Sequence, residues 1–135
     1  MSDNRETDIK PRYDIVVIGA GPGGMSVANT LAGYGLEVAV FDAASEPGGQ
    51  IYQRIGSASS VLKRILGRDY RRGEKVASKF DQTVDRGDVE YHRNARVWYI
   101  NSDNQIGVLK SGVSHQTNAT EVVIATGCQE RPMPI

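Results

Sequence analysis

The chain has 135 residues, which suffices for one domain with a hydrophobic core but not for two. Its 16 basic residues balance its 16 acidic residues, so the composition gives no electrostatic case for binding nucleic acid or an anionic membrane surface. The apolar runs are too short to span a bilayer, and a single cysteine excludes an internal disulfide. We therefore expect a cytoplasmic protein without a transmembrane segment, whose polar residues 1–12 form a disordered tail.

Two apolar segments, separated by a stretch with helical spacing, follow this tail. Residues 13–18 and 37–42 are almost continuously apolar, which predicts parallel strands buried on both faces. The stretch between them places apolar and small residues three and four positions apart, as an amphipathic helix does (Met25, Ala28, Leu31 and Ala32). Together the three segments predict one β–α–β unit.

The middle of the chain predicts a loop and then helix. Residues 43–60 are expected to form a loop that contains a Pro-Gly-Gly-Gln turn. Helical spacing follows over residues 61–66 and again over residues 71–85. Because glycine is a poor helix former, Gly67 and Gly73 are predicted to interrupt this helix.

The last part of the chain predicts strands. Residues 89–92 form a short third strand, and alternating patterns over 97–100, over 106–110 and near Ser114 predict an antiparallel meander. One of the two adjacent aromatic residues in the first meander strand is expected in the core and the other at the surface. A separate buried strand is predicted over 121–125.

The glycine-rich run Gly19-Ala20-Gly21-Pro22-Gly23-Gly24 lies between the first strand and the first helix. In such a GxGxxG pattern the first glycine permits a tight turn, the second lets the backbone approach a pyrophosphate, and the third lets the helix pack close to the strand. The diphosphate would lie on free N–H groups at the positive end of the helix dipole. Strand, glycines, helix and the acidic Asp42 after the next strand, in this order, favour a dinucleotide site over a merely glycine-rich turn.

Three further features narrow the dinucleotide to FAD. Asp42 is placed to accept hydrogen bonds from a ribose 2′-hydroxyl and would repel a 2′-phosphate, unless it is only a solvated acid at a strand end. The turn over residues 47–50 can direct N–H groups at a diphosphate or a flavin, or be an ordinary glycine turn. The last strand runs into Ala125-Thr126-Gly127 at the same sheet edge as the first glycines, where open parallel sheets bind ligands.

Taken together, these motifs resemble the two-dinucleotide-binding-domain flavoproteins, which are pyridine nucleotide-disulfide oxidoreductase-like. The segments 47–52 and 125–132 are most similar to the FAD-carrying α subunits of opine oxidases, hydroxyproline dehydrogenase, heterotetrameric sarcosine oxidase and hydrogen cyanide synthase. The resemblance implies a Rossmann-like α/β FAD-binding domain over residues 13–135. Its parallel strands would follow the order 3-2-1 and then the strand ending in Ala-Thr-Gly, with a β-meander on one crossover.

The resemblance also implies which residues bind FAD. Gly19, Gly21, Pro22 and Gly23 would cradle the diphosphate, Asp42 would hold the ribose at a position that is more often Glu in the family, and Gly49 and Gln50 would line the flavin. The backbone of Val97 would pair with the adenine, and Thr126 and Gly127 would lie over the diphosphate. Whichever of Trp98 and Tyr99 is not in the core would be exposed or lie beside this adenine. The full predicted set is Gly19, Ala20, Gly21, Pro22, Gly23, Gly24, Phe41, Asp42, Gly49, Gln50, Val97, Ala125, Thr126 and Gly127.

The chain departs from the family in length. Members are typically several times longer, with an NAD-type domain and a returning segment that completes the FAD domain. Because this chain ends just past its Ala-Thr-Gly strand, we expect an incomplete FAD domain that lacks at least its last strand. A truncated form, a proteolytic fragment and a broken reading frame are alternatives that the sequence leaves open.

The implied function is that of an FAD-dependent oxidoreductase, which dehydrogenates an amino acid, an opine or a related secondary amine and works with partner subunits or a second copy. One alternative is a relative of NAD(P)H-dependent flavoprotein reductases, and another is a non-catalytic nucleotide-binding or assembly subunit. The residues indicate no general base or nucleophile, so no catalytic residue is assigned. Cys128 lacks a second cysteine, and His92 and His115 lack partners at metal-ligand spacing, so no metal site is expected.

Overall fold

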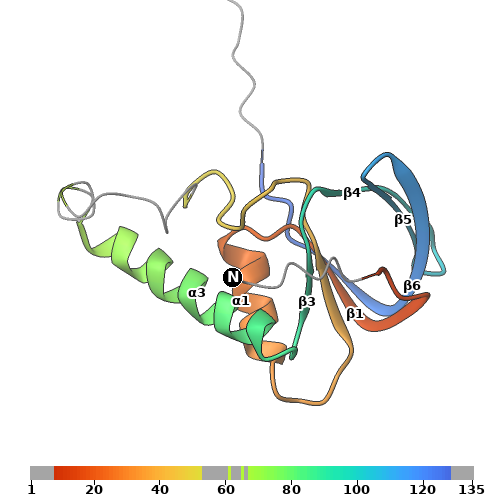
Figure 1. Ribbon diagram of the computed structural model, residues 1–135, viewed down its shortest axis with the longest axis horizontal. Helices are drawn as coiled ribbons and strands as arrows, with labels where there is room; N and C mark the ends of the chain where they lie inside the picture. Colours follow the sequence, from red (N-terminus) through yellow and green to blue (C-terminus); the bar gives the residue numbers. More distant parts are fainter. Residues whose placement is uncertain (1–7, 53–60, 62–64, 66, 129–135) are drawn as a thin grey trace, which may run out of the picture.

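The computed structural model describes residues 8–52, 61, 65 and 67–128 (Figure 1). In these ranges one sheet has the strand order β3-β2-β1-β6-β5-β4. The strands are β1 (Arg12–Ile18), β2 (Val38–Phe41), β3 (Glu90–His92), β4 (Ala95–Ile100), β5 (Gln105–Lys110) and β6 (Val113–Ile124). β1 pairs in parallel with β2 and β6, and β2 pairs in parallel with β3. The predicted α/β class and the strand order 3-2-1 followed by the strand that leads into Ala-Thr-Gly are therefore confirmed.

The meander and the parallel part of the sheet share one long strand. β6 pairs antiparallel with β5 up to Asn118, and from Asn118 to Ile124 it pairs in parallel with β1. The prediction of separate strands near Ser114 and over 121–125 is therefore wrong. Polar residues in the middle of β6 interrupt its apolar pattern, yet the buried Thr117 hydroxyl donates a hydrogen bond to the Lys10 carbonyl at 2.7 Å. That bond satisfies a polar group that would otherwise argue against a continuous buried strand.

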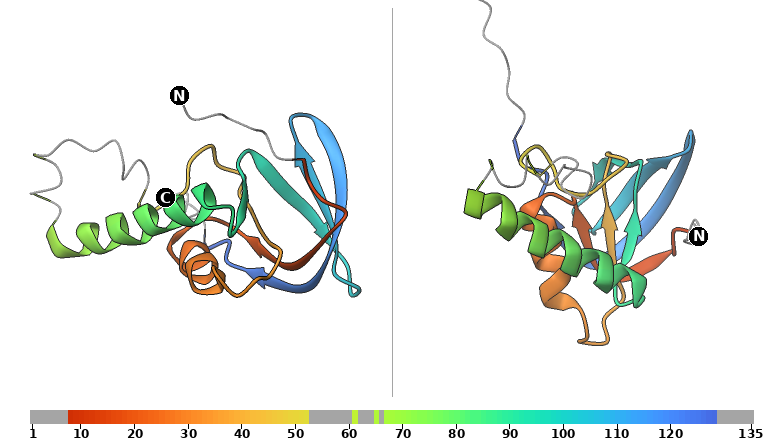
Figure 2. Two further views of the ribbon diagram at one scale, coloured as in Figure 1. Left: turned by 60° about the horizontal axis from the view of Figure 1, so that its bottom comes forward. Right: turned by 60° about the vertical axis from the view of Figure 1, so that its left-hand side comes forward.

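Two helices cover the face of the sheet opposite the meander, as Figure 2 shows. They are α1 (Pro22–Leu31) and α3 (Gly67–Asp85). Gly73 does not interrupt α3, contrary to the prediction, because the glycine is buried where the helix meets another side chain. Gly67, by contrast, is the first residue of α3 and has φ +76°, outside the helical range, and residue 66 before it lies outside the described residues, so the predicted interruption at Gly67 stays a prediction. Of the expected helix over 61–66, all residues but Val61 and Ile65 lie outside the described part of the chain, as do residues 53–60 of the expected loop.

The sheet separates two hydrophobic clusters. The first lies on the helical side and joins strand residues to the two helices (Val17, Val38, Val40, Met25, Ala28, Ala77 and Phe80). The second lies on the meander side (Tyr13, Val16, Ile18, Phe41, Ala95, Ile106 and Val108). Burial on both faces explains why β1 and β2 read as continuous apolar runs.

A polar cluster of Lys10, Tyr13, Glu90 and His92 lies against the second hydrophobic cluster. The Tyr13 hydroxyl donates to Glu90 Oε2 at 2.8 Å, and Lys10 Nζ lies 2.6 Å from Glu90 Oε1. The His92 ring is 1% exposed and stacks on Phe41 with ring centroids 4.9 Å apart. Burial lowers the pKa of His92 and raises the pKa of Tyr13, while the hydrogen bond to Glu90 raises the pKa of Lys10.

Lys10 belongs to the expected tail over residues 1–12, of which residues 1–7 lie outside the described ranges. From Ile9 onward the chain packs against the core. The boundary of the domain at residue 13 stays a prediction.

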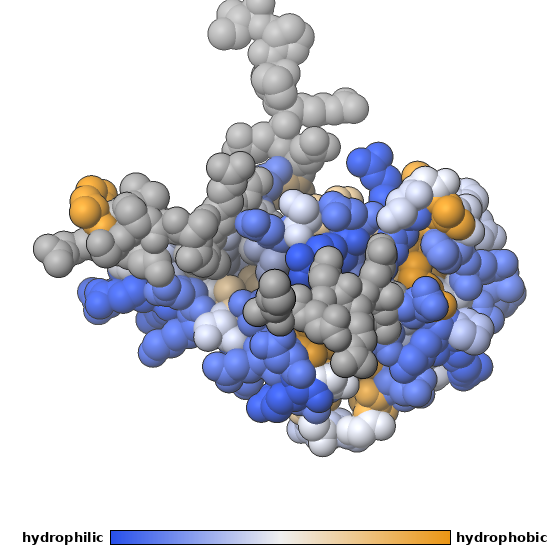
Figure 3. Space-filling model, viewed as in Figure 1, coloured by the Kyte–Doolittle hydropathy of each residue, from blue (hydrophilic) through white to orange (hydrophobic). Residues whose placement is uncertain are grey.

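The meander presents apolar side chains to solvent. Figure 3 shows hydrophobic atoms on the surface at this end of the molecule. Trp98 is 63% exposed and Tyr99 is 42% exposed, so the expectation that one of the two lies in the core is wrong. The pairing of β4 with β5 shifts register between Val97 and Tyr99, and this irregularity breaks the strict alternation that the prediction assumed. The Trp98 ring lies against Gly107 of β5, where a Cβ would come within 2.9 Å of it.

Candidate functional site

The first glycine turn joins the carboxyl ends of three strands. Gly19 has φ +100°, a conformation that favours glycine, and a Cβ there would lie 2.5 Å from the Ala125 carbonyl oxygen. The Gly19 N–H donates to the Phe41 carbonyl at 2.8 Å, and the Ala125 N–H donates to the Ile18 carbonyl at 2.8 Å. The ends of β1, β2 and β6 therefore meet at one edge of the sheet, as the sequence predicted.

The turn leads the chain into α1, whose first turn has no side-chain cap among the described residues. A Cβ at Gly24 would overlap the Gly19 carbonyl, so only glycine lets α1 approach β1 this closely. Gly21 is the N-cap of α1, and within the described residues no side-chain hydrogen bond caps the helix and no acidic side chain lies in its first turn. The first N–H groups of a helix have no partner within the helix, and the dipole makes this end positive. The site therefore suits an anionic group.

A second glycine turn lies directly against the first. The Gly48 N–H donates to the Ala20 carbonyl at 2.8 Å, and Gly48 has φ +127°. A Cβ at Gly49 would lie 3.1 Å from Gly21 Cα, whereas one at Gly21 would lie at an ordinary 3.8 Å from Gly49 Cα. The two motifs that the sequence assigned to one ligand are thus brought together, with the exposed Gln50 beside them. The Pro-Gly-Gly-Gln segment is more than an isolated glycine turn.

Asp42 follows β2 and supports the first turn. Its Oδ2 accepts a hydrogen bond from the Ala20 N–H at 2.9 Å, and its Oδ1 accepts one from the Ala44 N–H at 2.9 Å. The alternative of a merely solvated acid does not describe this residue. Each carboxylate oxygen has a second lone pair, so the half-buried side chain can still accept hydrogen bonds from a ribose hydroxyl. The bond to Ala20 was not foreseen, because sequence spacing shows position but not which donor a short side chain reaches.

Phe41 takes part in the site only through its backbone. Its side chain is 1% exposed and packs against Tyr13 and His92 on the meander side. Its carbonyl accepts the Gly19 N–H described above. The residue therefore fixes the position of the glycine turn and presents no side chain to a ligand.

The remaining predicted residues border a pocket of about 290 Å³ between β1, β4 and β6. Val97 and Thr126 both line it, and Ala125 and Gly127 flank Thr126 at the end of β6. Gly127 has φ +69°. The other lining residues are Ile18, Trp98, Tyr99, Ile100 and Ile124. Sequence reasoning left one of Trp98 and Tyr99 exposed or beside the adenine, and it gave the three isoleucines no role at a site.

The described residues offer little for other kinds of chemistry. In the ranges 8–52 and 67–128, with residues 61 and 65, no three His, Cys, Asp or Glu side chains gather as metal ligands. Cys128 is exposed. None of the helices that the structure describes is long and apolar enough to cross a membrane. The glycine-lined edge is thus the feature with the clearest ligand chemistry, and it fits a diphosphate.

Known proteins match this chain over most of its length. It is 39% identical over 137 residues to a subunit of the opine oxidase of Agrobacterium tumefaciens (strain Ach5), in a match that covers 96% of this chain and 26% of the relative. It is 34% identical to hydrogen cyanide synthase subunit HcnB of Pseudomonas aeruginosa, over 88% of this chain and 25% of that protein. The chain therefore spans about a quarter of the length of the curated relatives it matches.

Solved structures share the fold. L-proline dehydrogenase from P. horikoshii superposes with a TM-score of 0.68 at 20% identity, over 98% of this chain and 26% of that one. Thioredoxin reductase from Streptococcus pyogenes superposes with a TM-score of 0.62 at 26% identity, over 94% of this chain and 39% of that one. The pattern of the pyridine nucleotide-disulphide oxidoreductase family matches residues 13–135. The chain belongs to this family of oxidoreductases, and the predicted cofactor, FAD, is confirmed.

Proposed function

We propose that the glycine-lined edge binds FAD and that this flavin domain serves the dehydrogenation of an amino acid, an opine or a related secondary amine. The observation that carries the proposal is the meeting of two glycine turns at the uncapped start of α1. When bound, FAD supplies the capacity to accept a hydride equivalent from a C–H next to an amine nitrogen. The chain itself supplies binding, orientation and electrostatics.

The residues divide the cofactor between them as follows. The N–H groups at the start of α1 hold the diphosphate between Gly19 and Gly24, with Ala125, Thr126 and Gly127 on its other side. Asp42 accepts the ribose hydroxyls, and the backbone of Val97 pairs with the adenine. Gly49 and Gln50 lie toward the flavin. The open space beyond Gly23, where a Cβ would meet no atom within 4 Å, supports this placement of the diphosphate.

The substrate class rests on the names of the relatives. Besides its likeness to the opine oxidase, the chain is 27% identical over 128 residues to the alpha chain of sarcosine oxidase from Corynebacterium sp. (strain P-1). A stretch of 41 residues is 51% identical to N,N-dimethylglycine/sarcosine dehydrogenase of Chromohalobacter salexigens. Opines, sarcosine and dimethylglycine all carry an amine nitrogen beside an oxidisable carbon, which is the chemistry that we propose for this chain.

Two further parts of the proposal concern the surroundings of the domain. Several relatives are named as subunits, which supports assembly with partner subunits. A cytoplasmic location fits the single cysteine.

A reductase function is the second candidate, and the observation that favours it is the chain's 28% identity to dihydrolipoyl dehydrogenase 3 of Pseudomonas aeruginosa. A reductase of disulfides would need a redox-active cysteine pair, and this sequence holds one cysteine.

Two matched substitutions test the placement of FAD. Gly21→Ala adds a Cβ that the protein accommodates at 3.8 Å, so the fold should persist while the new methyl group keeps the diphosphate from the backbone. We expect FAD affinity, measured by fluorescence quenching, to fall about tenfold or more, equivalent to about 1.4 kcal/mol. Thr30→Ala is the control, because this exposed residue near the end of α1 lies outside the glycine turn and alanine favours the helix. Equal affinities of the two variants would contradict the placement.

The substrate class needs a separate assay. Once bound FAD is seen in the visible spectrum, amino acids, opines and N-methyl amino acids are offered anaerobically and bleaching of the flavin is followed. Bleaching by NAD(P)H alone, with no response to any amine, would favour the reductase alternative.

A further inference from the structure

The second glycine turn closes on itself and ends at Tyr52. The Tyr52 N–H donates to the Gly48 carbonyl at 3.1 Å, and a Cβ at Gly48 would overlap the Tyr52 carbonyl. The same Gly48 residue donates its N–H to Ala20 of the first turn at 2.8 Å. The position of Tyr52 and the position of the turn on the first glycine loop are therefore linked through one residue.

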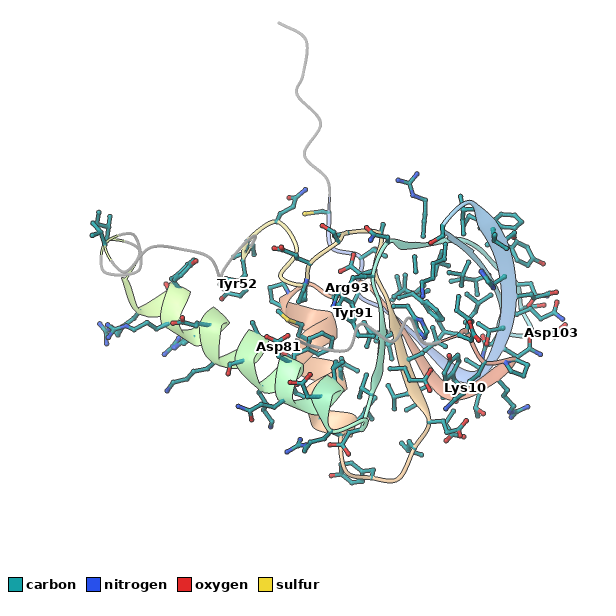
Figure 4. All side chains as sticks on the ribbon, viewed as in Figure 1. Lys10, Tyr52, Asp81, Tyr91, Arg93 and Asp103 are labelled. Atoms are coloured by element: carbon teal, nitrogen blue, oxygen red, sulfur yellow. The ribbon has the colours of Figure 1, made fainter. Side chains whose placement is uncertain are left out.

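The Tyr52 side chain is seated on α3. A Cβ at Gly73 would overlap three carbon atoms of the Tyr52 ring, so this buried glycine leaves the space that the ring fills. Gly73 does not have a positive φ, and glycine is among the poorest formers of helix interiors. The backbone of α3 thus has no need of glycine at this position, whereas the ring does. Figure 4 shows Tyr52 beside α3, away from the strands.

The aromatic ring makes this contact, and the hydroxyl adds little to it. The Tyr52 hydroxyl lies 3.5 Å from the Asp69 carbonyl, at the limit of a hydrogen bond. The ring packs against the first hydrophobic cluster, which includes Ala77 on the next turn of α3. A phenylalanine would keep these contacts, and an alanine would lose them.

We propose that Tyr52 is a positioning residue, which by seating its ring on Gly73 holds the second glycine turn against the first and so preorganises the FAD site. The inference rests on the proposed placement of FAD for its functional part only. A turn that is already held in place loses less conformational freedom when a ligand binds, which strengthens binding. If the Tyr52 ring did not pack on Gly73, the turn would still have the contacts of Gly48 and Gly49 with Ala20 and Gly21 and the backbone bond from the Tyr52 N–H, but it would lose its attachment to α3.

The contact between the Tyr52 ring and Gly73 is tested by a cycle of two substitutions, with the melting temperature as the readout. Gly73→Ala should lower the Tm of the chain, because the new Cβ meets the Tyr52 ring. In a Tyr52→Ala background the same Gly73→Ala change should raise the Tm, because the clash is gone and alanine favours the helix. This reversal of sign is expected only if the Tyr52 ring occupies the space that the missing Cβ of Gly73 leaves. If Gly73→Ala changes the Tm by the same amount in both backgrounds, the packing of the Tyr52 ring on Gly73 is refuted.

The positioning role is tested by two readouts that do not depend on activity. Tyr52→Ala should accelerate amide hydrogen exchange at Gly48 about tenfold, since the bond to Ala20 opens more often, and should accelerate FAD release to a similar extent. Tyr52→Phe should restore both, and Tyr34→Ala, at a tyrosine that is 75% exposed, should change neither. Unchanged exchange at Gly48 in Tyr52→Ala overturns the inference. If the unmutated chain fails to bind FAD, the proposed function fails, and the exchange at Gly48 alone decides the role of Tyr52.

Discussion

The glycine turns and the polar cluster both adjoin strand β1, yet the turns are formed by backbone and the cluster by side chains. The turns consist of backbone, with glycine wherever a Cβ would collide with a neighbouring carbonyl, as at Gly19 and Gly24. The cluster consists of side chains that pair with one another, with Tyr13 and Lys10 both bound to Glu90, although the buried His92 Nδ1 has no hydrogen-bond partner among the described residues. A ligand site must keep donors free, whereas an interior must pair them. The difference separates the part of the molecule that binds from the part that holds the strands together.

The largest expected effect on stability comes from a substitution in the glycine turns. Gly24→Ala places a Cβ on the Gly19 carbonyl, and neither backbone can yield without moving α1 off the sheet. We expect a loss of about 3 kcal/mol in the free energy of unfolding, at the upper end for overpacked sites. Urea denaturation measures it, with Gly23→Ala as the neighbouring control of unchanged or slightly higher stability. A Gly24→Ala variant as stable as the control would refute the close helix–strand contact.

The next largest effect on stability comes from a substitution in the polar cluster. Tyr13→Phe removes the hydroxyl that donates to Glu90, accepts the Lys10 N–H and lies 3.3 Å from His92 Nε2, leaving three groups of the cluster short of a partner. We expect a loss of about 1–3 kcal/mol in stability. Binding of FAD, measured at a temperature where both proteins are folded, should not change. A change in affinity larger than the change in the exposed control Tyr34→Phe would show that the cluster reaches the site.

Asp42 is where the two regions overlap, because it is a side chain at the glycine edge. Asp42→Asn keeps one acceptor oxygen and replaces the other with a donor, so either Ala20 or Ala44 loses its partner. We expect about 1 kcal/mol of stability to be lost, together with a severalfold weaker FAD affinity. Asp14→Asn, at an acid that caps the Glu37 N–H far from the turns, is the matched control. A loss of stability without a loss of FAD affinity would limit the role of Asp42 to supporting the first glycine turn.

The smallest expected effect is a pH dependence that comes from the polar cluster. Burial lowers the pKa of His92 below its ordinary value of about 6.5, so below that pH the unfolded chain binds a proton that the folded chain refuses. Stability should therefore fall as the pH drops through about 6.5 and level off below the folded pKa. His92→Phe, which keeps the stacking on Phe41, should flatten this part of the profile, measured as Tm between about pH 7.5 and 5. An unchanged slope would assign the effect to other groups.

The sequence predicted those parts of the fold that depend on local pattern. β1, α1 and β2 follow directly from two apolar runs and a helical spacing, and the glycine run between β1 and α1 predicts the ligand edge. Asp42 and the Gly48-Gly49 turn were assigned to the same ligand from motif order alone, and the structure brings them to the same loop. The predictions of where these segments lie succeeded because each needs only neighbours in the sequence or the known direction of parallel strands, while the binding of a ligand by these residues stays a prediction.

The parts that failed depend on partners distant in sequence. The prediction that Gly73 breaks the helix failed because the cause of the glycine at this position, the ring of Tyr52, lies outside the helix. The exposure of both Trp98 and Tyr99 follows from a register shift against β5 that no periodicity in β4 reveals. The bond from Ala20 to Asp42 likewise becomes visible only once the turn and the strand end are placed side by side.

The continuous strand β6 makes the two halves of the sheet dependent on one alignment. Asn118 is paired with Arg12 on one edge and with Gln105 on the other, so β6 connects the parallel part of the sheet to the antiparallel meander. A slip of one residue turns every side chain of a strand to the opposite face. In β6 such a slip would misplace the meander and the Ala-Thr-Gly end at once. The distance between the adenine side of the proposed site, in β4, and its diphosphate side, just after β6, therefore depends on the register of β6. We expect insertions and deletions to be tolerated in the turns of this chain but not within β6.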